Sequence, residues 1–124
     1  MNVAGATMKS DTQRAIMQLI DLVPQLNPIL RESEIDNDEI LPHLVLSDVI
    51  RWMTNHRADE HEACVTVIRW MEESYAAGSE SVQELVVVSG VEMIPDPGFP
   101  GSEFRGWLRG PLRAADPWPR DSRG

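Results

Sequence analysis

Apolar and polar residues alternate along this chain with the period of an α-helix. Ile16, Leu19 and Ile20 form the first apolar set. Leu19 and Ile20 stand three and four residues after Ile16, which places all three on one helical face. Ser10 and Gln13 have the spacing of a capping box, in which each side chain bonds the backbone of the other residue at a helix start. The pattern therefore predicts a first helix that starts at Ser10.

Prolines and acids separate this helix from the next one. Pro24 and Pro28 each lack a backbone donor and clash with the preceding turn, so we expect the first helix to end or kink near Val23. A second short turn is expected to follow through Leu30. Residues 31–40 (RESEIDNDEI) hold five acids and one arginine, and we expect a solvated acidic connector there.

The stretch that begins at Pro42 predicts a central helix. Proline is favoured in the first turn of a helix, and a broad apolar stripe follows it. The expected members of this stripe are Leu41, Leu44, Val45, Leu46, Val49, Ile50, Trp52 and Met53.

A further helix is expected after Asn55-His56-Arg57. Asp59 and Glu62 have capping-box spacing at its start. Gly78 is expected to stop it by adopting a left-handed conformation. The expected packing face repeats at steps of four, three and four and consists of Cys64, Ile68, Met71 and Tyr75.

Residues 82–94 fit either a helix or a strand. The β-branched run 86–88 (VVV) would suit a strand, whereas a cap at Ser81 and Glu84 and the preceding glycine favour a helix, which we expect. Gly90 is costly inside a helix, so we expect it to permit close approach of a neighbouring helix.

The C-terminal region is expected to be less regular. Residues 95–101 (PDPGFPG) hold three prolines and two glycines, which exclude regular structure. Ser102 is expected to cap a short helix that ends or bends at Gly110-Pro111. Its expected apolar residues are Phe104, Trp107 and Leu108. Steps of four also predict a basic stripe on this helix, formed by Arg105, Arg109 and Arg113.

These elements predict an all-α fold, a compact bundle of about five helices in which short connections make consecutive helices antiparallel. The length of 124 residues fits one domain. We expect residues 1–9 to be a flexible N-terminal arm, residues 10–113 to be the single helical domain and residues 114–124 to be a C-terminal tail, where Trp118 could dock back.

The phrase VIRWM occurs twice, at residues 49–53 and again 18 residues later at 67–71. We expect each copy to bury its Trp-Met pair and to leave its arginine pointing elsewhere. The alternative is that the aromatic residues Trp52, Trp70, Phe104 and Trp107 line a ligand pocket, although helically spaced aromatics are more often core residues. Stacked helical hairpins reuse one packing solution, so a helical scaffold or a homodimerising module is one functional alternative, although the step is shorter than known solenoid periods.

The net charge of −9 is unevenly distributed. Residues 1–94 hold 16 acids and 6 bases, which gives −10, and residues 95–124 hold 4 acids and 5 bases, which gives +1. Such a field repels nucleic acid and attracts basic partners, so we expect no nucleic-acid partner. The plainer alternative is that the acidity serves only solubility.

Hydropathy and cysteine content bear on the compartment. No apolar run approaches the roughly 18 to 20 residues that cross a bilayer, so we expect no membrane partner. The N-terminal residues do not form a secretory signal, and Cys64 is the only cysteine, which excludes an internal disulfide. We therefore expect a cytoplasmic protein.

The chain contains fragments of metal and thiol sites but no complete one. A zinc-protease helix would need a second histidine where Val65 stands, and the pair of His61 and Cys64 offers too few ligands for a metal. Cys64 as a nucleophile is disfavoured because Glu60 and Glu62 oppose a thiolate. We expect no metal and no cofactor.

A serine-based site is also incomplete in the sequence. Ser47 and Ser89 lie inside expected helices without the strained, glycine-flanked turn that exposes a nucleophile. His43 and Asp48 fall on different faces of one helix, although an arrangement across helices stays open. We therefore expect no enzyme. A small hydrolase that uses Cys64 or a serine is the third hypothesis.

The acidic residues are the strongest functional lead. Carboxylates held on a rigid scaffold can meet the lysines and arginines of a basic protein and speed the encounter. One expected patch lies in the acidic connector and consists of Glu32, Glu34, Asp36, Asp38 and Glu39. The other lies on a helical hairpin whose only base is Arg69, and it consists of Asp59, Glu60, Glu62, Glu72, Glu73, Glu80 and Glu84. These residues predict a non-catalytic protein-binding module with a basic protein partner.

Two groups of residues resemble a small bacterial all-helical family of uncharacterised function. The resemblance covers roughly residues 40–113. Similar proteins often sit beside secreted bacterial toxins, so the resemblance implies an immunity protein that neutralises a toxin by covering its basic active-site cleft. It transfers no catalytic residue. The residues that carry it are Leu41-Pro42-His43-Leu44, Ser47-Asp48 and Arg51-Trp52, and then Gly78, Val82-Gln83 and Val88-Ser89-Gly90-Val91-Glu92.

Overall fold

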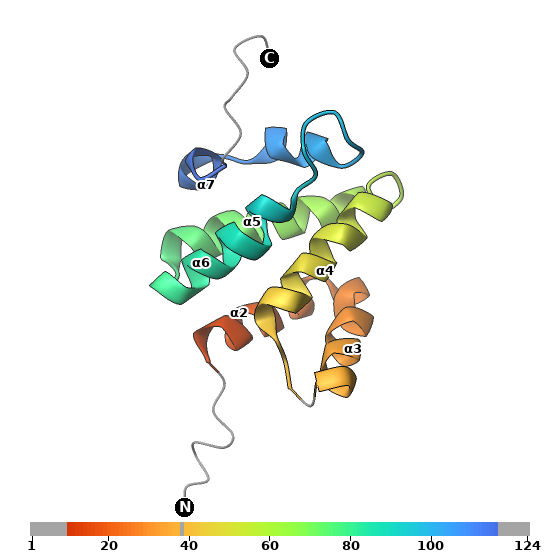
Figure 1. Cartoon of the computed structure of the whole chain (residues 1–124), viewed down its shortest axis with the longest axis vertical. Coiled ribbons are helices and arrows are strands. Elements are labelled where there is room, and N and C mark those ends of the chain that lie inside the picture. Colours follow the sequence, from red (N-terminus) through yellow and green to blue (C-terminus); the bar gives the residue numbers. More distant parts are fainter. Residues whose placement is uncertain (1–9, 38, 117–124) are drawn as a thin grey trace, which may run out of the picture.

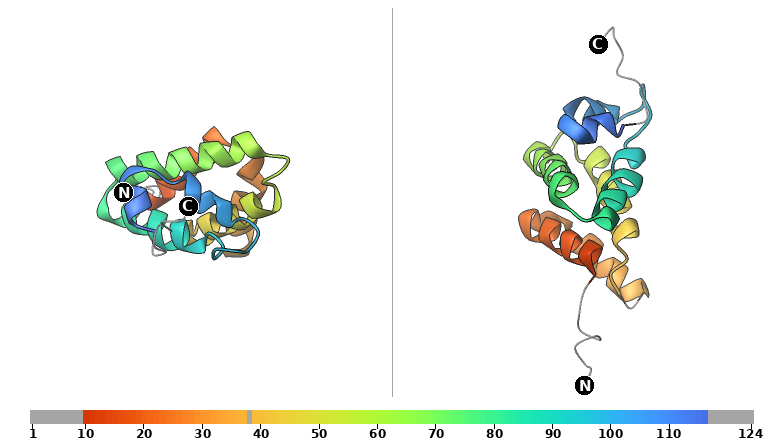
Figure 2. Two further views of the ribbon diagram at one scale, coloured as in Figure 1. Left: turned by 90° about the horizontal axis from the view of Figure 1, so that it is seen from above. Right: turned by 90° about the vertical axis from the view of Figure 1, so that its left-hand side faces the viewer.

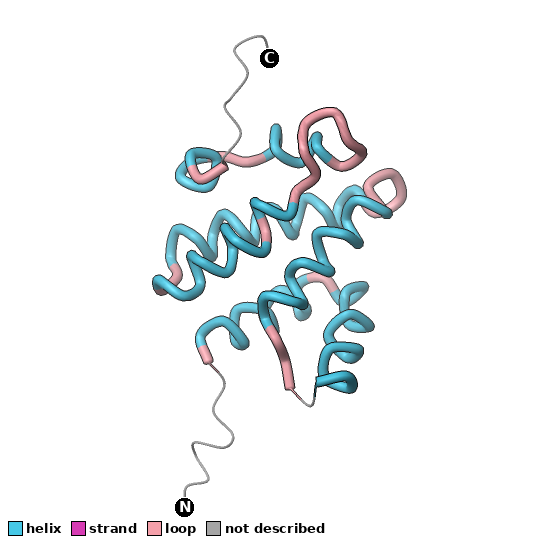
Figure 3. Tube along the Cα trace, in the orientation of Figure 1, coloured by secondary structure: helices cyan, strands magenta, loops and turns pink. Residues whose placement is uncertain are grey.

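The computed structural model describes residues 10–37 and 39–116, and over these residues it is all-α, without strands (Figure 3). This confirms the predicted fold class. In chain order the elements are α2 (Asp11–Leu22), the 3₁₀ helix η1 (Pro24–Leu26), α3 (Asn27–Asn37), α4 (Pro42–Asn55), α5 (His61–Ala77), α6 (Glu80–Ser89), the 3₁₀ helices η2 (Val91–Met93) and η3 (Ser102–Trp107), and α7 (Gly110–Ala114).

The helices form three layers along the long axis of the molecule (Figure 1; Figure 2, right). Helices α2 and α3 form the layer next to the N-terminus, α4, α5 and α6 form the middle layer, and η3 and α7 cover the opposite side of that layer. Helix α5 packs against α2, α6 and α7, and α6 also packs against α2 and α4. The middle layer therefore has a neighbour on both sides.

A single core joins the three layers. It draws buried apolar side chains from α2, η1, α4, α5, α6 and the C-terminal elements. The largest fully buried side chains are Phe104, Ile16, Leu19, Leu26, Leu46, Ile50, Met53, Met71, Leu85, Ile94, Leu108 and Leu112. Every helix in the described part of the chain is too short or too polar to cross a bilayer.

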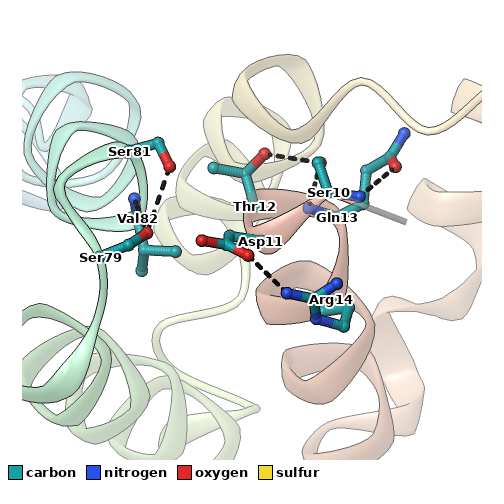
Figure 4. A network of polar contacts seen from close by, with 8 residues as sticks. All are labelled: Ser10, Asp11, Thr12, Gln13, Arg14, Ser79, Ser81 and Val82. Atoms are coloured by element: carbon teal, nitrogen blue, oxygen red, sulfur yellow. Dashed lines mark hydrogen bonds and ion pairs between the residues drawn. The ribbon is translucent and has the colours of Figure 1, made fainter. Parts of the chain in front are cut away.

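The first helix forms as predicted. The Ser10 side chain accepts from the backbone of Gln13 at 3.2 Å, and the Gln13 side chain accepts from the backbone of Ser10 at 3.0 Å, which completes the capping box (Figure 4). Helix α2 ends at Leu22, with Val23 at its C-cap. Pro24 then occupies the first position of η1.

The prediction of an acidic connector from residue 31 is wrong for residues 31–37, because α3 extends to Asn37. Pro28 stands second in α3, where a missing backbone donor costs no helical bond. Ser33 is buried in this helix, and its hydroxyl lies 3.5 Å from the Leu41 backbone nitrogen that donates to it. The acidic side chains of α3 are therefore exposed to solvent, whereas the small polar side chain of Ser33 is buried. Asp38 lies outside the described residues.

Two expected caps are wrong. Helix α5 begins at His61, and its N-cap residue, Glu60, makes no side-chain cap bond. Asp59 instead lies 3.3 Å from the His56 ring, because the backbone turns tightly over the His56 carbonyl before α5 starts. At α6 the cap is Ser79, two residues before the expected Ser81, and its hydroxyl accepts from the backbone of Val82 at 3.4 Å (Figure 4).

Gly78 ends α5, but for a different reason from the one predicted. Its φ of −85° is not left-handed. A Cβ atom added there would lie 2.7 Å from Cγ1 of Val82 and would also clash with the carbonyl oxygen of Ser74. Gly78 is therefore required for space. It lets α5 and α6 run back in opposite directions after only two residues (Figure 1).

The choice of helix for the valine-rich segment is confirmed, since α6 covers Glu80–Ser89 and is followed by η2. Gly90 is the C-cap of α6 rather than an interior residue. A Cβ atom added to it would lie 2.8 Å from Cε of Met71, so it does permit a close approach of α5.

The two copies of VIRWM differ in burial. Trp70 and Met71 are buried in α5, and Met53 is buried in α4, but Trp52 is only partly buried and stacks on His56 at a centroid distance of 4.8 Å. Leu44 is 43% exposed, which also contradicts its expected place in the core. Fewer residues of α4 are therefore buried than its hydrophobic pattern predicts.

The predicted arginine stripe is wrong because the C-terminal region does not form one helix. Gly101, at a φ of 95°, precedes η3, and Gly110 begins α7 rather than ending a helix. Arg105 points inward: it donates to the carbonyl oxygen of Pro95 at 3.1 Å and to a carboxylate oxygen of Asp116 at 2.6 Å. The side chains of this ion pair are 9% and 6% exposed. Residues 114–116, expected to begin a tail, therefore include a buried partner of the core. Trp118 and residues 1–9 lie outside the described residues.

We expect Gly78→Ala to destabilise the fold by about 1–3 kcal/mol, because its methyl group would collide with the Ser74 carbonyl and with Val82. Urea denaturation measures this change. Gly106→Ala is the matched control, since nothing lies within 4 Å of a Cβ atom at that position. A loss of stability at Gly106 as large as that at Gly78 would contradict the steric argument.

We expect Arg105→Ala to cost about 3–5 kcal/mol, because it leaves the Asp116 carboxylate buried without this cation. Arg113→Ala, which removes an exposed arginine from α7, should change stability by less than about 0.5 kcal/mol. Thermal and urea unfolding of the two variants provide the comparison. Equal midpoints would show that the buried pair does not hold this layer in place.

Candidate functional site

The acidic residues expected to bind a partner do not gather on one surface. Glu34 and Asp36 are exposed on α3, and Glu39 is exposed in the connection that follows. Helix α3 belongs to the layer next to the N-terminus, whereas the expected hairpin of α5 and α6 belongs to the middle layer (Figure 1). The two predicted patches are therefore separate surfaces.

The hairpin group itself is split along α5. Asp59, Glu60 and Glu62 lie at the start of that helix, and Glu73 lies in its last part. The step of 11 positions from Glu62 to Glu73 corresponds to roughly 16 Å along the helix. The second part of the group continues across the turn onto α6, where Glu80 and Glu84 are exposed.

Some of these carboxylates already have local partners. Asp59 lies beside His56, and Glu60 accepts from the side-chain amide of Gln25 at 3.1 Å. Glu72 turns partly inward, and one of its carboxylate oxygens is buried with no hydrogen-bond partner in the described part of the chain. It lines a pocket of about 280 Å³ together with Arg69, Arg109, Trp107, Val65 and Ile68.

Glu73, Glu80 and Glu84 form what we call the α5–α6 acidic group. All three are exposed, and within residues 10–37 and 39–116 none of them makes an ion pair. Glu80 lies in the first turn of α6, where the helix dipole favours a negative charge. The turn at Gly78 sets the spacing of the group, because it fixes the end of α5 against the start of α6.

Cys64 is not an activated thiol. It is fully buried, and its sulfur lies 3.8 Å from the Met53 carbonyl oxygen. Burial, together with the smaller effect of the negative charges of Glu60 and Asp59, raises the pKa of Cys64 to about 11. His61 is exposed and meets the edge of Trp107 instead, with ring centroids 5.3 Å apart. The described residues include no group of three or more side chains suited to a metal ion.

A serine and a histidine do meet across two helices, as the sequence left open. Nδ1 of His43 in α4 lies 2.6 Å from Oγ of Ser89 in α6. Ser89 is only 5% exposed, and Asp48 pairs with Arg51 rather than with His43. Ser89 also stands at the C-terminal end of its helix, where the dipole opposes an oxyanion. Among the described residues no carboxylate pairs with His43, and the contact between His43 and Ser89 ties α4 to α6.

A pocket of about 550 Å³ lies between α2, the end of α5 and the start of α6, and no sequence motif indicates it. Trp70 lines it, so the less favoured alternative of an aromatic residue at a pocket applies to Trp70, which is also buried in the core as expected. Its indole N–H is buried and has no hydrogen-bond partner among residues 10–37 and 39–116. Composition and periodicity could not reveal this pocket, because its walls come from three separate helices.

Comparisons with known proteins do not place the chain in a family. No family model matches it, and neither a curated protein nor a solved structure does. The resemblance to a small bacterial helical family therefore stays a prediction.

We expect native Cys64 to react at pH 8 at least about a hundredfold more slowly with a thiol reagent than the unfolded chain does, because a raised pKa leaves little thiolate. Absorbance during reaction with a disulfide reagent, with and without denaturant, measures both rates. The folded state holds the proton more tightly, so this group should also lower stability as the pH rises from about 9 towards 11. Rapid labelling of the native protein would contradict the assignment of Cys64 to the core.

Proposed function

We propose that this chain is a non-catalytic protein-binding module that docks a basic protein through the α5–α6 acidic group. The observation that carries the proposal is the placement of Glu73, Glu80 and Glu84 at one end of a rigid hairpin, exposed and without ion pairs among the described residues. Carboxylates that make no ion pair within the described residues can pair with the basic groups of a partner.

The surrounding charge supports such a role. The chain carries a net charge of −9, which would accelerate encounter with a positively charged surface. At physiological ionic strength the field decays over about 8 Å, so steering is strongest for a partner that approaches the acidic group closely. The three glutamates stand on helices whose facing sides are buried, so they need little reordering to meet lysines and arginines.

In its sharpest form the proposal is an immunity protein, located in the cytoplasm, that covers the basic active-site cleft of a bacterial toxin. Support for this form comes from the sequence resemblance and from the charge, since a cleft that holds an anionic substrate is complementary to a row of carboxylates. The acids on α3 would be free to extend the contact or to serve solubility alone.

The alternative of a repeating scaffold gains no support from the fold. Stacked repeats should place equivalent residues in equivalent surroundings. Trp70 is 2% exposed, whereas Trp52 is only partly buried and stacks on His56. The two copies of VIRWM are therefore not structural equivalents.

We expect charge reversal of the acidic group to abolish partner binding. The variant Glu73→Lys/Glu80→Lys/Glu84→Lys should recover no specific basic protein from lysate of the native host, whereas the wild-type chain should recover one that elutes at about 0.5 M salt. Affinity capture with identification by mass spectrometry, followed by titration of the purified partner, measures this difference.

The matched control is Asp21→Lys/Glu92→Lys/Asp96→Lys, which makes the same change in net charge at exposed positions away from the group. It should keep at least about a third of the wild-type affinity, because rim charges away from a contact contribute little. Equal loss in the two triple variants, or binding that does not respond to salt, would refute docking at this group.

A further inference from the structure

The pocket that Glu72 lines lies between α5 and the layer of η3 and α7, which covers α5 on that side (Figure 1). Its volume of about 280 Å³ is close to the lower end of the range for small-molecule sites, so it has room for a molecule with a single ring. Helix α5 supplies four of its six lining residues, and η3 and the N-cap of α7 supply the other two. These residues are Val65, Ile68, Arg69, Glu72, Trp107 and Arg109.

Two arginines of this pocket, Arg69 and Arg109, are exposed and make no ion pair among the residues that the structure describes. This holds even towards Glu72, which stands three residues after Arg69 on the same helix. The guanidinium of Arg109 donates to the carbonyl oxygens of Gly106 and Leu108 at 3.3 and 3.4 Å, which holds it beside η3. A guanidinium with no carboxylate partner can bind both oxygen atoms of an anion through its parallel N–H groups.

The charges on the walls restrict the kind of anion. The chain as a whole carries −9, but two arginines and one glutamate give the walls of this pocket a charge of +1. Glu72 acts on a ligand through its charge, since one of its carboxylate oxygens is buried. A ligand with one negative charge balances the walls, whereas a second negative charge would be repelled by Glu72.

The remaining walls favour a flat apolar body next to the anionic group. Val65 and Ile68 supply aliphatic side chains, and Trp107 supplies a half-buried indole ring. Edge contacts hold this ring in place, with centroid distances of 4.9 Å to Phe104 and 5.3 Å to His61. An aromatic ring packs well against an indole and against the plane of a guanidinium. A small inorganic anion would leave these apolar walls uncovered.

We propose that this pocket binds a small aromatic monocarboxylate. The carboxylate lies between the guanidinium groups of Arg69 and Arg109, and the ring contacts Val65, Ile68 and Trp107. The pocket shares no residue with the α5–α6 acidic group. Ligand binding here is therefore a second activity of the chain that does not rest on the docking of a basic protein.

The test uses four probes: benzoate, benzamide, inorganic phosphate and isophthalate. We expect benzoate to move the indole N–H resonance of Trp107 in a ¹H–¹⁵N spectrum of the full chain, with half-saturation at about 1–10 mM, as ligand efficiency for so small a molecule allows. Benzamide, which has the ring without the charge, and phosphate, which has charge without the ring, should each bind at least about 10-fold more weakly. Isophthalate, which has a second carboxylate, should also bind more weakly than benzoate. Trp107→Phe identifies the resonance.

Variants of single charges distinguish the pocket from the rest of the surface. Arg69→Gln and Arg109→Gln should each weaken benzoate binding about 10-fold, because each removes a charged donor from the walls. Arg113→Gln is the matched control, since Arg113 is an exposed arginine of α7 that does not line the pocket, and it should change the affinity less than about 2-fold. Glu72→Gln should strengthen the binding of isophthalate more than that of benzoate. Thermal unfolding of each variant establishes that it is folded.

The proposal is overturned if benzoate causes no saturable shift, or if benzamide or phosphate binds as tightly as benzoate. It is also overturned if isophthalate binds more tightly than benzoate to the wild-type chain, or if Arg113→Gln weakens benzoate binding as much as Arg69→Gln does. None of these variants changes the α5–α6 acidic group. A failure here therefore leaves the docking of a basic protein standing, and loss of docking in the glutamate-to-lysine variant leaves this pocket intact.

Discussion

The close approach of α5 and α6 is the constraint on which the rest of this structure depends. It is fixed at both ends of α6 by a glycine with no room for a methyl group, Gly78 against Val82 and Gly90 against Met71. A tight hairpin buries the apolar faces of both helices together with α2 and α4. The same contact sets the spacing of the acidic group and forms one wall of the Trp70 pocket.

Local sequence signals predicted those parts of the fold that depend on neighbours in the chain. The capping box at Ser10 and the helical periodicity of α4, α5 and α6 depend only on residues close together in the chain, and the structure confirms both predictions. The cap of α6 was misplaced because Ser81 matches the capping-box pattern, whereas Ser79, which has Val82 at the third position, does not. Helix α6 begins only two residues after α5 ends, a position that the spacing of Ser81 and Glu84 does not indicate.

The features that matter for function were harder to predict because they join distant segments. Exposure of the single acids follows from their chemistry, but their separation into groups follows from the length of α5 and the position of α3. Arg105 has the spacing of a surface stripe, yet it is buried because the carbonyl groups of a proline-rich loop and Asp116 surround it. Similarly, no sequence pattern indicates that the indole N–H of Trp70 finds no acceptor within the residues that the structure describes.

The ion pair of Arg105 and Asp116 extends the folding unit beyond α7, to residue 116 at least. Asp116 stands two residues beyond the end of α7. A shortened chain that stops at the last turn of α7 would therefore leave Arg105 buried without this carboxylate. Affinity tags and fusion partners therefore belong after residue 116, and the minimal piece for expression or crystallisation is longer than its helices.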